Sequence, residues 1–484
     1  MLQPKYLIFL SYYMLSSVQT APEPGFQARI TKRGLDYVNE NALVTLVAEL
    51  PRTNIPDQSG SSGDIEYSLY EIRILPDIRA PSSTITLGPG NGLTWSASNA
   101  GLSLHAGWRV KYKKGWVKIS TSGTVDVTLS GINFGITINI GQDANGRPST
   151  SAAGCQSSIG GVSISIHGEL SVILNLFKGI VEKKVREIIP GKLCNAVTNI
   201  VNINAESQMQ KLKVVIPLLG NRFLLDYRLI LPPSFTSLYL QTYHKGEITW
   251  AANPSSPPFS PQPIPSSGDS SKMAYLWISE YLPQSLAYAA QSNGFLRYNL
   301  TSQDFKSGNE SVLNTTCPGH ICIGTLFPAI AKKYPNSQVE LRMSSSEMPV
   351  VKMRPGSLGA SFMGNIDFYA HTPCGQIAYL LTLNVSASMN FSASLSNEKL
   401  MGKIFGTRTI VSVQASAIGP LNDKVINFMV DTMMDLFIVP KLNEVGSRGF
   451  PLPTVDNIKF VNSELEIIQD TLLVATDVQY IARR

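Results

Sequence analysis

Strict alternation of apolar and polar residues between Gly101 and Gly141 constrains the fold of this chain more than any other feature. In its first stretch every second side chain is apolar, namely Leu102, Leu104, Ala106, Trp108, Val110 and Tyr112. The pattern resumes after Lys114 and Gly115 and runs on to Ile140. Because successive side chains of a strand point to opposite faces, it predicts an antiparallel meander of long strands with one apolar face.

A proline-rich segment at residues 253–269 is the strongest internal boundary. Its prolines alternate with serines; they are Pro254, Pro257, Pro258, Pro261, Pro263 and Pro265. Proline lacks the backbone N–H and fixes its φ angle, so the segment can hold neither a helix nor a central strand. We therefore predict a linker at 253–269, between a first half at 21–252 and a second half at 270–484.

Each half is expected to contain an early helix and a late helix, with strands between them. Apolar periodicity places these helices at residues 26–50, 170–189, 271–291 and 421–439. Pro51, Pro190 and Pro440 are expected to end three of them. The repeated order predicts an α+β protein made of two similar halves that arose by duplication.

The first 20 residues predict a secretory signal peptide. Lys5 precedes an apolar run from Tyr6 to Leu15, which is too short to span a bilayer, and small polar residues follow up to Thr20. We expect cleavage after Thr20 and a secreted protein. Five candidate N-glycosylation sites agree with secretion, namely Asn299, Asn309, Asn314, Asn384 and Asn390.

Secretion favours disulfides among the five cysteines. We expect Cys155 to pair with Cys194, which would close a loop of about 40 residues. The pairing of Cys317, Cys322 and Cys374 stays open. With His320 and His371 these three could form a zinc site, but disulfides are the commoner outcome and we predict no metal.

A basic cluster surrounds the turn at Lys114 and Gly115. Residues 21–250 hold 22 Lys and Arg against 17 Asp and Glu, a net charge of +5, whereas residues 251–484 hold 17 of each. The clustered cations are Arg109, Lys111, Lys113, Lys114 and Lys118, with Trp108, Tyr112 and Trp116 among them. Such a set suits phosphates above an apolar layer, but lysines that protect a hairpin edge from aggregation are the alternative.

Catalysis and specific nucleic-acid binding have no support in the sequence. It lacks a Gly-x-Ser-x-Gly elbow, a His-Glu-x-x-His motif and a phosphate loop with its lysine. The glycine-rich run from Gly88 to Gly92 lies between strand-like segments and is expected to form a turn. No nucleic-acid-binding motif accompanies the basic residues. We predict that the chain is not an enzyme.

Several stretches, in order, resemble the bactericidal/permeability-increasing and lipopolysaccharide-binding protein family. They are Ile30 to Tyr37, Ile55 to Asp57, the hairpin from Trp108 to Lys118, the pair Cys155 and Cys194, the proline linker, and Gly449 to Pro453. The resemblance implies an elongated boomerang of two similar halves. In each half a curved antiparallel barrel-like sheet packs on a long helix, and a central sheet joins the halves. Each half is expected to hold a phospholipid, with no other cofactor.

The resemblance also implies a function. It predicts a monomeric innate-immune protein that binds lipopolysaccharide on the Gram-negative outer membrane, and the alternative is a lipid transfer protein. The expected binding residues are Arg52, Trp108, Arg109, Lys111, Lys113, Lys114, Trp116 and Lys118. One departure is Asn54, where relatives tend to have a basic residue before Ile-Pro-Asp. Killing of bacteria and hand-over of the lipid to a receptor are not distinguished by the sequence.

Overall fold

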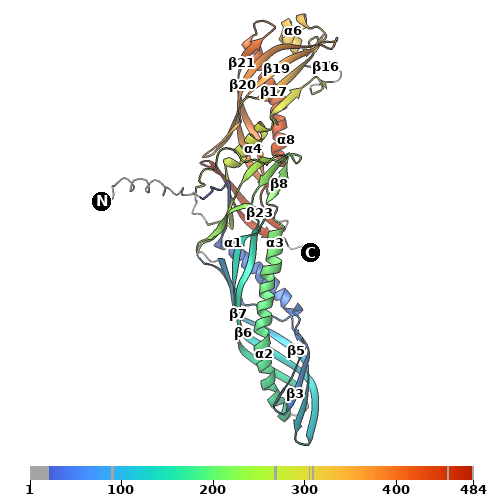
Figure 1. Ribbon diagram of the computed structural model, residues 1–484, viewed down its shortest axis with the longest axis vertical. Helices are drawn as coiled ribbons and strands as arrows, with labels where there is room; N and C mark the ends of the chain where they lie inside the picture. The colour runs from blue at the N-terminus through green and yellow to red at the C-terminus, as the bar shows by residue number, and fades with distance from the viewer. Residues whose placement is uncertain are drawn as a thin grey trace, which may run out of the picture.

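The molecule is elongated, with its two halves end to end (Figure 1). The structure is a computed structural model that describes residues 21–88, 92–169, 171–265, 270–304, 306–307, 310–454 and 457–481. The predicted signal peptide, the middle of the Gly88 to Gly92 run and Asn309 lie outside these ranges. No helix in the described ranges is both long and apolar enough to cross a bilayer.

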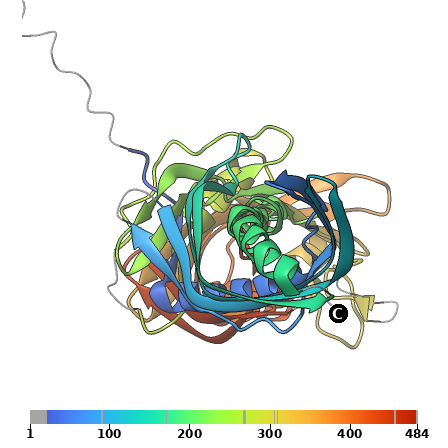
Figure 2. The same ribbon diagram turned by 90° about the horizontal axis from the view of Figure 1, so that it is seen from below.

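The first half is an antiparallel sheet that curls around one long helix. Its strands are β2 (Gln58–Ser62), β3 (Ile65–Ile74), β4 (Ser82–Gly88), β5 (Gly92–Lys114), β6 (Val117–Gln142) and β7 (Pro148–Gly168). Its helical elements are α1 (Lys32–Glu49), η1 (Leu50–Arg52), α2 (Ser171–Asn199), η2 (Ile200–Ala205) and α3 (Glu206–Gln210). Seen end-on, α2 lies inside the curl of the sheet (Figure 2). The alternation from Gly101 to Gly141 therefore marks real long strands, and its apolar side chains form the core beneath α2.

The second half repeats this arrangement. Its sheet holds β14 (Arg297–Leu300), β17 (Gln338–Ser345), β18 (Val350–Arg354), β19 (Ser357–His371), β20 (Ile377–Ser396), β21 (Lys399–Ser416) and β22 (Phe450–Pro451). Its helices are α4 (Tyr281–Ser292), α5 (Ile323–Leu326), α6 (Pro328–Lys333), α7 (Asp423–Met433), η3 (Met434–Ile438) and α8 (Val439–Arg448), and β15 (Lys306–Ser307) pairs with β16 (Glu310–Ser311). Both halves thus have a meander followed by a late helix.

A central sheet built from both halves joins them. Its order is β10 (Leu229–Phe235), β11 (Tyr239–His244), β1 (Phe26–Thr31), β13 (Ala274–Ser279), β24 (Thr471–Tyr480) and β23 (Ile458–Ile468). A separate small sheet is formed by β12 (Glu247–Trp250), β9 (Phe223–Asp226) and β8 (Val215–Leu218), which precede and follow β10 and β11 along the chain. The strands β1 and β13 are antiparallel neighbours, with Phe26 opposite Ile278. The predicted α+β fold with a central sheet is confirmed.

The start of α1 explains one of the family-like stretches. Thr31 caps the helix, since its side chain accepts a hydrogen bond from the Gly34 N–H. A Cβ atom on Gly34 would lie 2.5 Å from the carbonyl oxygen of Met273. Glycine is therefore required here for the helix to pass close to the second half of the chain.

Two helix predictions were wrong at their beginnings. Residues 26–31 form β1, and residues 274–279 form β13 rather than the start of a helix. The residues of β13 from Tyr275 to Ser279 are all buried. A strand that is buried on both faces has no polar–apolar alternation, so its sequence is easily mistaken for a buried helix.

Two prolines did not end their helices. Pro190 lies inside α2, which continues to Asn199, and Pro440 lies in the first turn of α8, which continues to Arg448. A first-turn proline costs little because its missing N–H has no partner there. At Pro190 the cost of about 3 kcal/mol is offset by packing, since Ile189 and Leu193 on either side are buried.

Candidate functional site

The hairpin between β5 and β6 forms the outer end of the first half (Figure 1). Its turn consists of Gly115 and Trp116, and Gly115 has a φ of +60°, which favours glycine. Lys113 lies opposite Lys118, and Lys114 lies opposite Val117. The local sequence thus folds a tight turn with cations on both arms.

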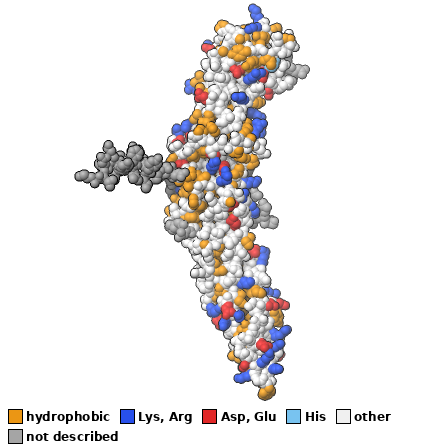
Figure 3. All heavy atoms as spheres, in the orientation of Figure 1, with side chains coloured by type: hydrophobic (Ala, Val, Ile, Leu, Met, Phe, Trp, Pro, Cys, Tyr) orange, Lys and Arg blue, Asp and Glu red, His pale blue; other side chains and the backbone are white. Residues whose placement is uncertain are grey.

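The structure brings four of the predicted cations to one face of this hairpin. Arg109, Lys111 and Lys113 alternate along β5, so they share a face, and the partner of Lys113 across the strands is Lys118. All four side chains are exposed, as is Lys114 next to the turn. Trp116 is 92% exposed. The space-filling view shows basic side chains gathered along this end and a hydrophobic one at its extremity (Figure 3).

One acidic side chain lies in this cluster, and the sequence did not predict it. Glu66 of β3 is paired with Lys111 across the strands, and its Oε1 accepts a hydrogen bond from Lys113 Nζ at 2.5 Å. This bond holds the pKa of Glu66 below its usual value. The cluster stays basic, but Glu66 neutralises part of its charge.

Trp108 is not a surface residue, and its prediction as part of the binding site was wrong. Its exposed fraction is 0%, and its ring centroid lies 5.2 Å from that of Phe177 on α2. Its Nε1 donates to the carbonyl oxygen of Thr124 at 3.0 Å. The alternation that predicts the strand also places Trp108 on the apolar face, so it anchors α2 and does not reach a ligand at the turn.

Arg52 is not brought to the hairpin turn. It ends η1, forms an ion pair with Glu49 at 2.9 Å, and lines a cleft beside Lys192 of α2. Phe177 of α2 contacts Trp108 of the hairpin strand β5. Lys192 lies 15 residues further along α2, or about 22 Å along the helix axis. Lys192 Nζ also donates to the carbonyl oxygen of Asn54 at 2.9 Å. The loop before Ile-Pro-Asp therefore belongs to a different surface.

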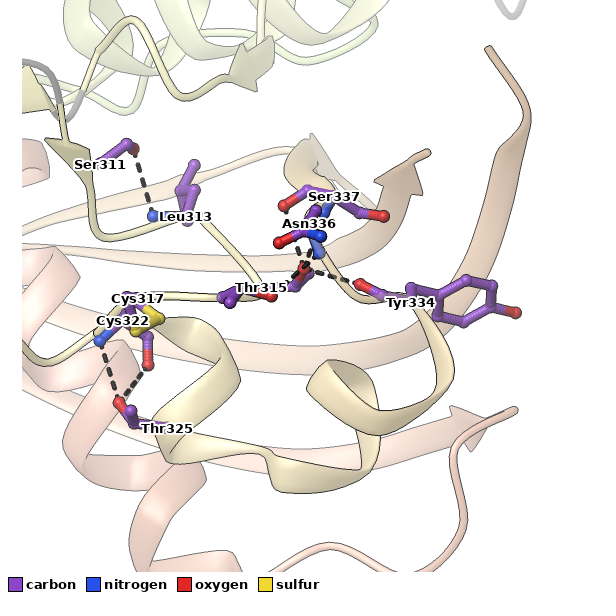
Figure 4. Close-up of a disulfide and its surroundings, with 10 residues drawn as sticks. Ser311, Leu313, Thr315, Cys317, Cys322, Thr325, Tyr334, Asn336 and Ser337 are labelled. Atoms are coloured by element: carbon purple, nitrogen blue, oxygen red, sulfur yellow. Dashed lines mark hydrogen bonds between the residues drawn. A yellow bond between two sulfur atoms is a disulfide. The ribbon is translucent and has the colours of Figure 1, made fainter. Parts of the chain in front are cut away.

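Two disulfides are formed. Cys155 of β7 is bonded to Cys194 of α2, which fixes the long helix to the last strand of the meander. Cys317 is bonded to Cys322, and this settles the pairing that the sequence left open (Figure 4). Cys374 is a free, exposed cysteine. Because the sulfur atoms of Cys317 and Cys322 are bonded to each other, the alternative of a zinc site with thiolate ligands from both does not hold.

The loop around the second disulfide is held by threonine side chains. Thr315 Oγ1 donates to the carbonyl oxygen of Tyr334 at 2.6 Å, and Thr325 Oγ1 accepts from the N–H of Cys322 at 2.9 Å (Figure 4). These bonds join the disulfide loop to α5 and α6. The arrangement stabilises the outer part of the second half.

The predicted glycosylation sites differ in exposure. Asn299 and Asn390 are exposed, whereas Asn314 and Asn384 are half-buried. Asn384 also donates from Nδ2 to Asn365 Oδ1 at 3.3 Å. Asn299 donates from Nδ2 to Glu340 Oε1 at 3.0 Å, so Asn390 is the better-placed acceptor among the described residues.

A small apolar cavity of about 40 Å³ lies beneath α2. Residues of strands β2, β3, β5 and β6 and of the helix line it, including Leu69, Leu104, Val127, Val181 and Val185. A cavity of this size holds a few water molecules.

The whole chain is similar to known proteins of one family. The LBP / BPI / CETP family models match at residues 34–204 for the N-terminal domain and 218–480 for the C-terminal domain. The bactericidal permeability-increasing protein of Sebastes schlegelii is 27% identical over 477 residues, covering 98% of both chains. The lipopolysaccharide-binding protein of Mus musculus is 28% identical over 480 residues, covering 98% of this chain and 96% of that one.

A solved structure gives the same result. The crystal structure of lipopolysaccharide binding protein matches 95% of this chain and 100% of its own, with 26% identity and a TM-score of 0.61. The boundary between the family models, at 204–218, precedes the proline-rich segment. Strands β9 to β12 are therefore matched with the C-terminal domain, although they precede the predicted linker.

Proposed function

The chain belongs to the LBP / BPI / CETP family of lipid-binding, non-enzymatic proteins, and from this we propose that it is a secreted protein that binds lipopolysaccharide of Gram-negative bacteria. The prediction that it is not an enzyme is confirmed by the family. The recognition of the family from the sequence is confirmed as well.

The observation that carries the proposal is the exposed basic face around the β5–β6 turn. Arg109, Lys111, Lys113 and Lys118 point the same way, and Trp116 projects beyond them. Lipopolysaccharide presents phosphates above a layer of acyl chains. Lysine and arginine pair with phosphates, while an indole ring favours a polar–apolar boundary. The turn thus offers both groups that such a surface would bind.

The strength of the site must come from several cations acting together. Single exposed ion pairs contribute little and are screened by salt. Contact with an acyl layer removes water from the cluster and strengthens each pair. Binding is therefore expected to weaken as the salt concentration rises, without disappearing at physiological ionic strength.

We also propose that each half carries a phospholipid between its sheet and its late helix. Burial of acyl chains contributes about 0.8 kcal/mol per CH₂ group, so no specific polar contact is required. The apolar lining of the cavity beneath α2 supports this proposal for the first half. Organic extraction and lipid mass spectrometry of protein secreted by eukaryotic cells should recover phospholipid in stoichiometric amounts, and its absence would contradict this part.

Charge reversal at the turn tests the lipopolysaccharide site. The variant Lys113→Glu, Lys114→Glu and Lys118→Glu should lose binding to vesicles that contain lipid A, while its melting temperature stays that of the parent. The matched control is Lys403→Glu, Lys424→Glu and Lys459→Glu, which changes three exposed lysines of the second half by the same charge. Parental binding by the first variant would reject the site, and loss of binding by the control would show that only net charge matters.

A further inference from the structure

A polar cleft of about 540 Å³ lies between the end of α1 and the second part of α2. Its lining includes Arg52, Thr53 and Asn54 on one side and Lys192, Asn195, Asn199 and Asn204 on the other. This volume falls in the range of sites that hold small molecules. We call it the amide cleft, because four asparagines line it.

The exposed face of α2 changes its chemistry at this cleft. Earlier in the helix it carries charged pairs, Glu182 with Arg186 and Lys184 with Glu187. Between Glu187 and Glu206 no acidic residue occurs, and three of the exposed helix positions facing the cleft, Asn195, Asn199 and Asn204, are asparagines. Asparagine is a poor helix former, and a merely solvated helix face gains nothing from it. Its repetition at the cleft therefore calls for another reason.

The helix geometry keeps these amides together. Asn195 and Asn199 are four residues apart, so they lie on one face of α2. The π-helical turn η2 then adds a residue per turn, which brings Asn204 to the same cleft. Asn202 points elsewhere and accepts a hydrogen bond from the N–H of Ala152 at 2.8 Å. π-Helical turns often mark functional sites.

The side chains in the cleft are available to a ligand. Within the described ranges, the side-chain amides of Asn54, Asn195, Asn199 and Asn204 have no hydrogen-bond partner in the protein. Glu49 also lines the cleft and is paired with Arg52, and Lys192 Nζ donates to the carbonyl oxygen of Asn54, so neither cation is left without a partner for a phosphate. Ile203, which also lines it, is 59% exposed.

This combination fits a saccharide better than other ligands. Each amide both donates and accepts, as each sugar hydroxyl does, and Ile203 can pack against the C–H face of a sugar ring. An acyl chain would need an apolar lining, and a phosphate group would need more than one available cation. The route from Asn195 back along α2 to Phe177, and then along β5 from Trp108 to the turn at Gly115, is about 50 Å long. A saccharide that extends outward from a membrane surface at the turn would pass it.

We propose that the amide cleft binds the polysaccharide chain of lipopolysaccharide. The identification of the saccharide as part of lipopolysaccharide rests on the proposed function, whereas the proposal that the cleft binds a saccharide does not. The turn would hold the lipid A phosphates, and the cleft would hold sugars further from the membrane. Two separate sites on one molecule of ligand would raise the affinity by making the second contact intramolecular.

The test uses the full chain and a lipid-free probe, the O-polysaccharide released by mild acid from smooth lipopolysaccharide. Calorimetry should show binding to the parent, and Asn195→Ala with Asn199→Ala should weaken it by roughly tenfold, as expected for two lost hydrogen bonds. Asn175→Ala is the matched control, because Asn175 is an exposed asparagine of α2 outside the cleft. Alanine favours the helix, so these variants should fold.

The outcomes separate the cleft from the turn. Both asparagine variants should bind lipid A vesicles like the parent, and the Lys113, Lys114 and Lys118 variant should still bind the polysaccharide. A parent that binds lipid A but not the lipid-free polysaccharide would overturn the cleft and leave the proposed function standing. Competition by inorganic phosphate would also overturn it, because the cleft would then be an anion site. A parent that binds neither probe would reject both proposals.

Discussion

The two halves share one fold but end in hairpins of different chemistry. The β5–β6 turn of the first half has its counterpart in the β19–β20 turn of the second, as both join the middle strands of their meanders. The first turn is Lys113-Lys114-Gly115-Trp116, and the second runs from Thr372 to Gln376 without a charged residue. Each contains a glycine of positive φ, Gly115 at +60° and Gly375 at +81°. The two turns thus share a glycine of positive φ, but only the first carries a cluster of cations.

A glutamate on the neighbouring strand shows the same difference. Glu66 contacts Lys113, and in the second half Glu340 contacts His371 at 2.7 Å. Glu340 also accepts a hydrogen bond from Arg342, the main cause of its lowered pKa. In the second half the glutamate is thus balanced locally, whereas in the first half one glutamate faces a surplus of cations. The two ends therefore differ in the charge around this glutamate and not in the arrangement of their strands.

The late helices differ as well. The helix α2 runs for 29 residues and is bonded to β7 through Cys194. Its counterpart consists of α7, η3 and α8 and has no such bond among the described residues; Asn443 instead accepts a hydrogen bond from the N–H of Ile404 in β21. The first half therefore holds its helix covalently and the second by hydrogen bonds and packing.

The largest expected effect separates the two tryptophans of the hairpin. Trp108→Ala should lower the free energy of unfolding by about 3–5 kcal/mol, because a large buried ring is removed from the contact with α2. Trp116→Ala should change it by no more than about 0.5 kcal/mol, since that ring is exposed. Denaturant unfolding measures both. Equal effects would show that the assignment of one ring to the core and one to the surface is wrong.

Removal of the Cys155–Cys194 bond should have the next largest effect. The loop of about 40 residues that it closes corresponds to about 4 kcal/mol in the chain-entropy model, so Cys155→Ala with Cys194→Ala should unfold at much lower denaturant. Cys374→Ala is the control, because that thiol is free and exposed. A stability loss in the control as large as in the double variant would contradict the role of the bond.

Acid should destabilise the central sheet through His244. Burial lowers the pKa of this histidine to about 4, while its carbonyl partner Tyr227 opposes the shift. The native state prefers the neutral ring, so stability is full above the unfolded pKa of about 6.5 and falls as the pH drops towards 4. Between pH 7 and pH 5 the loss should be about 2 kcal/mol. His244→Gln should flatten this part of the profile, and an unchanged slope would contradict the assignment.

The smallest effect concerns the glutamate beside the lysines. Glu66→Gln should strengthen binding to lipid A vesicles a few-fold at low salt, because it frees Lys113 and raises the charge of the cluster. Glu340→Gln, the matching change in the second half, should leave binding unaltered. Weaker binding by Glu66→Gln would mean that the glutamate positions Lys113 for its ligand.

Sequence reasoning predicted the fold best where the pattern was local. The alternation around Trp108 fixed the long strands, and Cys155 with Cys194 marked the link to the late helix. It failed for β13, where both faces are buried, and at Pro190, where packing against β7 outweighs the cost of proline in a helix.

The candidate site was predicted only in part, because the sequence pattern reports contacts between residues that are near in the chain and not those from distant strands. Neighbours across the turn, such as Lys113 and Lys118, are close in sequence, but Glu66 reaches them from a distant strand. Arg52 was predicted to bind the same ligand as the turn, although it lies beside Lys192, far along α2 from the hairpin. The amide cleft could have been found from the sequence, because α2 has no acidic residue after Glu187 and carries asparagines there instead.

Hydrogen exchange with and without lipopolysaccharide tests the central claim most directly, because it shows where the ligand touches the intact chain. In the presence of vesicles that contain lipid A, the amides of residues 109–118 should exchange more slowly, and those of residues 371–377 in the matching hairpin should not change. Protection of the second hairpin alone, or of neither, would contradict the account that lipopolysaccharide is bound by the basic turn of the first half.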